Sequence, residues 1–169
     1  MSNILPTKLN GSKLALLSEY RKAIDELIAI IQTISSIELH TIIDTETNDD
    51  DCRSIQTILS HVVCSGFGYI IYVENWVGLM KERPEKRYHT FVQQYIEDLN
   101  IMYEYSLNFF QNHPTLEMEQ IDNDQTIKVN WGQCYDVEQL MEHAIVHVLR
   151  HRRQIEKFKE RLNYITSNT

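Results

Sequence analysis

Four long stretches of this chain repeat their apolar residues at the spacing of an α-helix, and this periodicity limits the possible folds more than any other feature. The stretches cover about residues 12–34, 53–80, 90–111 and 136–164. Within each stretch the apolar residues recur three or four positions apart, so they fall on one helix face. Five Gly and three Pro in 169 residues are few turn formers for a many-stranded sheet. The sequence therefore predicts an all-α fold in which residues 1–169 form one domain, a four-helix bundle.

The first two connections between long helices are expected to be simple. The acidic stretch Asp44–Asp51 lacks the central Gly and final Glu of a calcium-binding loop, so we expect a solvated connector there. The stretch Glu82–Arg87 is expected to form a turn. Within the second helix, Gly66 and Gly68 predict a bend or the close approach of a neighbouring element.

The third connection, between Pro114 and Asp136, changes from helical to alternating spacing. Apolar residues alternate with polar ones around Leu116 and again around Val129, with Asp122–Asp124 at the expected turn. We therefore expect a small hairpin or irregular insertion before the last helix. A connection of this length in a compact domain is often a lid or a binding loop. Asp136 and Gln139 have the spacing of a capping box at the start of the last helix.

The overall charge and the ends of the chain restrict its partners and its location. The net charge is -8 and the isoelectric point about 5.3, so the protein should repel phosphate backbones, and no nucleic-acid partner is expected. Three cysteines without CxxC spacing and a start without a charged and apolar leader argue against secretion. The most apolar stretch, residues 62–73, is too short for about 30 Å of hydrocarbon. We expect a cytoplasmic protein with no membrane segment.

Three histidines in the last helix, His143, His147 and His151, lie four residues apart, so neighbouring pairs can point at one spot. His151 lies roughly 40° from the apolar direction of this helix, His147 about 80° and His143 about 120°. A single helical histidine is more often exposed or hydrogen-bonded than a metal ligand. Burying two adjacent imidazoles costs desolvation, however, and a shared metal ion satisfies both in their neutral form. We therefore favour His147 and His151 as metal ligands.

A third ligand must come from another element, and the sequence offers four more histidines for this role. His40, His89 and His113 lie in or beside expected connectors, whereas His61 lies within a helix between core residues. On its own, His61 is equally well explained as a residue at the boundary of the core. The residue pattern alone leaves both explanations open.

Two motifs resemble those of a known family. The run from Ser54 to Val63, which contains His61, resembles the second-helix motif of the DinB/YfiT-like superfamily of metalloproteins. The run from His143 to Ile155 resembles its fourth-helix HxxxHRxQ motif, although Arg152–Arg153 replaces the usual Arg-Gly. The resemblance implies a four-helix bundle with one divalent metal ion, nickel or zinc first and iron or manganese as alternatives. Carried onto the matching positions, the implied ligands are His61, His147 and His151, and His143 is a flanking residue.

Three histidine ligands leave at least one coordination position open, which permits Lewis-acid catalysis. The resemblance favours a metal-dependent S-transferase that uses a low-molecular-weight thiol such as bacillithiol or mycothiol. A metal-dependent hydrolase is the first alternative, and an interaction module that the metal only stabilises is the second. The catalytic residues cannot be assigned from the sequence.

Several other side chains are candidates for the surroundings of the metal, although ordinary packing explains each of them as well. Cys64 and Ser65 follow His61 by about one helical turn, but a cysteine there is more often a small core residue. The candidates for orienting ligands or lining a pocket are Tyr72, Glu74, Gln154, Trp76 and Trp131. Val146 and Leu149 point away from the expected core of the last helix, which predicts a homodimer through that face.

Overall fold

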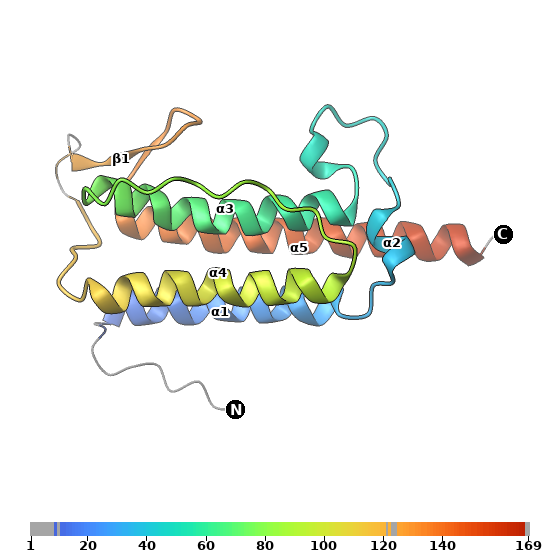
Figure 1. Ribbon diagram of the computed structural model, residues 1–169, viewed down its shortest axis with the longest axis horizontal. Helices are drawn as coiled ribbons and strands as arrows, with labels where there is room; N and C mark the ends of the chain where they lie inside the picture. Colours follow the sequence, from blue (N-terminus) through green and yellow to red (C-terminus); the bar gives the residue numbers. More distant parts are fainter. Residues whose placement is uncertain (1–8, 10, 121, 123–124, 168–169) are drawn as a thin grey trace.

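Four long helices lie side by side and make up most of the protein (Figure 1). The computed structural model describes residue 9, residues 11–120, residue 122 and residues 125–167. The long helices are α1 (Gly11–Ile31), α3 (Ile55–Trp76), α4 (Val92–Asn112) and α5 (Val137–Ser167). Each of them contacts two others, because α1 packs on α4 and α5, and α3 packs on α4 and α5. The predicted all-α class is confirmed.

Smaller elements close the two ends of the long helices. At one end lie α2 (Ser36–His40) and the 3-10 helix η1 (Asp50–Cys52), neither of which was predicted. At the other end, β1 (Ile127–Lys128) pairs antiparallel with β2 (Cys134–Tyr135), so that Ile127 lies opposite Tyr135. The predicted hairpin is therefore present between α4 and α5.

The position of the hairpin turn differs from the prediction. The turn joins the strands at residues 129–133 rather than at Asp122–Asp124, of which Asn123 and Asp124 lie outside the described residues. Gly132 adopts a φ of +87°, which glycine tolerates far better than other residues. This glycine, rather than the acidic stretch, permits the tight reversal of the chain.

Side chains that hydrogen-bond to the backbone mark where the long helices begin. Ser54 accepts a hydrogen bond from the Thr57 N–H and so caps α3. The predicted capping box of α5 is confirmed, because Gln139 N donates to Asp136 Oδ1 over 2.7 Å and Asp136 N donates to Gln139 Oε1 over 3.2 Å. At its other end α3 stops at Trp76, four residues before the predicted end, and Gly78 follows with a φ of +89°.

The segment 77–91 was predicted to contain a simple turn at Glu82–Arg87, and this prediction is wrong. Figure 1 shows the segment running back along the length of α3 before α4 begins, so that α3 and α4 point in the same direction. Two parallel helices need such a return crossing, whereas a short turn joins only antiparallel ones. Hydrogen bonds tie the segment to α3, with Ser60 Oγ donating to Arg87 O over 2.7 Å and Gln56 Nε2 to His89 O over 3.0 Å.

One continuous apolar core joins the four long helices and the hairpin. Its largest fully buried aromatic side chains are Tyr20, Tyr95, Tyr103 and Phe110. Helix α3 is long and apolar enough to cross a membrane by length and composition, but 72% of its most apolar window is buried inside the protein. Gly66 confirms the predicted close approach, since a Cβ there would lie 1.9 Å from Met102 Sδ of α4.

Candidate metal centre

The packing of α3 on α5 brings the three predicted histidines together. His61 lies in the second turn of α3, while His147 and His151 lie one turn apart on α5. The Nε2 atoms of His61 and His147 are 2.9 Å apart, and one ligand atom from each of the three side chains lies within 4.8 Å of the others. His151 is buried and the other two are half-buried. This group could hold a metal ion.

The outer ring nitrogens of two of these histidines are already occupied. His61 Nδ1 donates to Asp51 Oδ2 over 2.9 Å, and His151 Nδ1 donates to Gln154 Oε1 over 3.0 Å. With Nδ1 as the protonated nitrogen, Nε2 of each ring keeps its lone pair. A carboxylate or carbonyl oxygen on the outer nitrogen is what orients histidine ligands in metal sites.

The spacing of the three ligand atoms is close to what one ion requires. Two imidazole nitrogens bound at about 2.1 Å to the same ion are at most about 4.2 Å apart. The 2.9 Å separation of His61 and His147 meets this limit, and the 4.8 Å bound on the whole group exceeds it slightly. The donor set of three neutral imidazoles fits zinc or nickel.

Burial favours the neutral, metal-binding form of each imidazole. Desolvation by burial, aided by the neighbouring His151 and His61, lowers the pKa of His147 to about 2. Burial also lowers the pKa of His151, to about 4, with His61 as the next cause. For His61, burial lowers the pKa although the nearby Asp51 carboxylate opposes the shift. Three lone pairs are therefore available at neutral pH.

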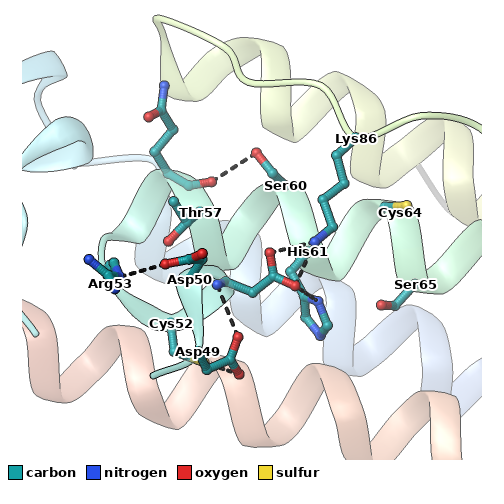
Figure 2. A network of polar contacts seen from close by, with 12 residues as sticks. Asp49, Asp50, Cys52, Arg53, Thr57, Ser60, His61, Cys64, Ser65 and Lys86 are labelled. Carbon is teal, nitrogen blue, oxygen red and sulfur yellow. Dashed lines mark hydrogen bonds and ion pairs between the residues drawn. The ribbon is translucent and has the colours of Figure 1, made fainter. Parts of the chain in front are cut away.

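Asp51 ends the acidic stretch that was expected to be a solvated connector. Most of this stretch is exposed as expected, but Asp51 is an exception. The side chain of Asp51 is only 22% exposed, and the ammonium of Lys86, from the segment 77–91, binds its carboxylate. Figure 2 shows Lys86 reaching across the face of α3 to the side of His61. Burial alone would raise the pKa of Asp51, but the hydrogen bond from Lys86 and the nearby His61 outweigh it, and the pKa is lowered. The carboxylate stays charged next to His61.

A cavity of about 290 Å³ opens beside the histidine group. Its lining residues are His61, Ser65, Gly68, Tyr69, Tyr72, Arg83, Trp131, His143 and His147. His143 does not join the other three histidines, because its ring stacks on Trp131 at a centroid distance of 5.4 Å and its Nδ1 lies 3.2 Å from Tyr135 Oη. His143 therefore lines the cavity without joining the histidine group. Trp131, from the hairpin, forms part of the cavity wall.

Of the other side chains considered from the sequence, Ser65, Tyr72 and Trp131 line this cavity and Gln154 holds His151. Cys64 instead faces the segment 77–91, where its Sγ donates to Pro84 O over 3.4 Å. Glu74 is buried away from the histidines and accepts a hydrogen bond from Tyr105. Trp76 is absent from the described lining of the cavity.

Sequence reasoning missed Asp51, Tyr69, Arg83 and Lys86. Asp51 is ten residues before His61, a spacing that no helix brings together, and Arg83 and Lys86 come from a segment expected to be a turn. Only Tyr69, two helical turns after His61, had a detectable signal, since residues eight positions apart share a helix face.

Replacement of His147 by alanine should remove most of the metal-binding affinity. The variant loses a ligand, so its zinc affinity should fall by more than the 10–100-fold that outer-shell changes produce. His143→Ala, one turn earlier on the same helix, should bind zinc within a few-fold of the unmodified protein. Competition with a chromophoric chelator measures both, and equal losses in the two variants would contradict the assignment.

Asp51→Asn should weaken metal binding less severely, by roughly 10–100-fold, because His61 loses a charged partner but not its lone pair. Asp50→Asn is the matched control, since Asp50 lies on the same turn, pairs with Arg53 and is 85% exposed. The same chelator competition should find Asp50→Asn unchanged. An unchanged Asp51→Asn would show that the contact does not support the ligand.

Comparison with known proteins does not identify the chain. No protein-family model matches it, and no curated protein matches it significantly.

Proposed function

We propose that the protein is a metal-dependent enzyme of the DinB/YfiT-like type, a four-helix bundle that binds one divalent ion through His61, His147 and His151. The observation that carries the proposal is the convergence of three imidazoles from two helices, two of them held from behind by Asp51 and Gln154. The two sequence motifs add support, because their histidines are the ones that converge. Nickel or zinc is the expected ion, with iron or manganese as alternatives.

A bound ion with an open position would act as a Lewis acid and lower the pKa of a thiol or water that it holds. The residues of the chain would orient the histidine ligands. Asp51 keeps the proton of His61 on Nδ1, and Gln154 does the same for His151. The cavity beside His61 and His147 would give a small molecule access to a bound ion.

The proposed reaction is the transfer of a low-molecular-weight thiol to an electrophile. In such a reaction the thiolate sulfur forms a bond to carbon and the leaving group departs with the bonding electrons. Metal hydrolases commonly pair the ion with a carboxylate that acts as general base. Among the described residues that line the cavity there is no Asp or Glu, which favours thiol transfer over hydrolysis. Hydrolysis remains the second candidate because His143 offers an alternative base.

Thiol transfer can be tested by mixing the zinc- or nickel-loaded protein with bacillithiol and 1-chloro-2,4-dinitrobenzene. Loss of free thiol should be faster than in the buffer blank, and both chelation and His147→Ala should return it to that blank. The matched control, His40→Ala, should keep the full rate because His40 is exposed on α2. Metal-dependent cleavage of p-nitrophenyl acetate without thiol would instead favour a hydrolase, and inactivity in both assays with a lower melting temperature after chelation would favour a non-catalytic module.

We also propose a cytoplasmic homodimer that does not bind nucleic acid. Val146 on α5 is 61% exposed, whereas Leu149 is partly buried against the core and contributes less to an outer apolar face than the sequence suggested. Light scattering at micromolar concentration should report a dimer, and Val146→Glu should shift it to monomer because a charge is buried in the contact. Ile37→Glu, at an exposed site on α2, is the control that should leave the dimer intact.

A further inference from the structure

Aromatic rings that contact one another form one wall of the cavity beside the histidine group. Trp131 stands edge-on to Tyr72, with centroids 5.9 Å apart and planes at 86°, and it stacks on His143 at 28°. Tyr72 also accepts a hydrogen bond from the Asn130 N–H over 3.1 Å, so the hairpin that carries Trp131 is tied to α3. A tied aromatic wall suits a planar or compact apolar group.

Among the described residues that line the same cavity, Arg83 is the only Lys or Arg. Its Nε donates to Cys64 O over 3.2 Å and its Nη2 donates to Ser65 Oγ over 3.2 Å. Its guanidinium lies over Gly68, where an added Cβ would come within 2.9 Å of Arg83 Cζ. The absence of a side chain at position 68 and the two hydrogen bonds together place the guanidinium at the cavity.

Arg83 forms no ion pair with the described residues of the chain. Within the part of the chain that the structure describes, no carboxylate lies at ion-pair distance from Arg83, and none lines the cavity. The whole chain carries a net charge of -8, so a guanidinium without an ion-pair partner is a local exception to its negative charge. Its neighbour in the segment, Lys86, is by comparison paired with Asp51.

We propose that the cavity binds a carboxylate-bearing substrate, whose carboxylate pairs with Arg83 and whose apolar body packs against Trp131 and Tyr72. The planar fork of a guanidinium matches the two oxygens of a carboxylate, and charge-assisted hydrogen bonds are about twice as strong as neutral ones. This inference rests on the proposed function in one respect: the end of the substrate away from the carboxylate would face the metal. Arg83 is then a substrate-binding residue that selects anions in an otherwise acidic protein.

Benzoate and its neutral counterpart benzamide test the proposal with the full chain. Each is titrated into metal-free protein, so that the carboxylate cannot bind an ion, and ligand-observed NMR gives the dissociation constants. Benzoate should bind roughly 10-fold tighter than benzamide or more, because a hydrogen-bonded charge pair replaces a neutral contact. Acetate, which lacks the ring, should bind more weakly than benzoate.

Variants of Arg83 test whether this residue causes the preference for benzoate over benzamide. Arg83→Gln should abolish the preference for benzoate, while Arg87→Gln, four residues along the same segment but lining a different cavity, should retain it. Arg83→Lys keeps the charge without the fork and should retain a smaller preference, which gives a second test if loss of the Cys64 and Ser65 contacts unfolds the glutamine variant. Circular dichroism melts establish that the variants are folded.

Equal binding of benzoate and benzamide by the unmodified protein would overturn the proposal, as would a preference that persists in folded Arg83→Gln or vanishes in folded Arg83→Lys. Zinc affinity measured on the same samples separates this inference from the proposed function. Zinc binding without any preference for benzoate refutes the anion site alone. A preference that depends on Arg83 in a protein that does not bind zinc supports the anion site and refutes the metalloenzyme.

Discussion

The contact between α3 and α5 positions the groups on which the candidate metal centre depends. The two helices pack on each other, and both carry buried apolar residues, among them Ile58 and Val62 of α3 and Val148 of α5. His61 and His147 lie at the edge of this contact and come within 2.9 Å of each other. This separation is a hydrogen-bond distance, while burial and mutual repulsion oppose the protonation of His147 and His151. The packing of α3 on α5 therefore brings the three side chains together.

The parallel arrangement of α3 and α4 has a consequence for the site. Because the chain must return along the whole length of α3, the segment 77–91 passes over the helix that carries His61. From this segment Lys86 reaches Asp51, and Arg83 reaches the cavity beside the histidines. Gly68 leaves room for the guanidinium. A connection required by the helix directions thus supplies the positive charges around the candidate site.

The hairpin between α4 and α5 belongs to the same functional region. It is short, with two residues in each strand, yet it places Trp131 opposite Tyr72 and against His143. Candidate metal ligands from two helices, an aromatic wall from the hairpin and a cation from the return segment therefore meet at one cavity. Such a combination from separate elements is usual for small-molecule sites, in which a few polar groups orient a mainly apolar ligand.

The amino-acid sequence by itself determined the four long helices, their ends to within four residues, and the histidines that could bind a metal. These features depend on local spacing, as in the 3.6-residue period of the core, the capping box of Asp136 and Gln139, and the four-residue interval between His147 and His151. Only the tertiary structure decided that Asp51 and Lys86 stand behind His61, that Cys64 faces away from the site, and that Arg83 faces the cavity. These residues meet through the directions of the helices and the path of the chain between them. Spacing along the sequence predicts neither the helix directions nor the path of the chain, because both depend on how separate elements pack.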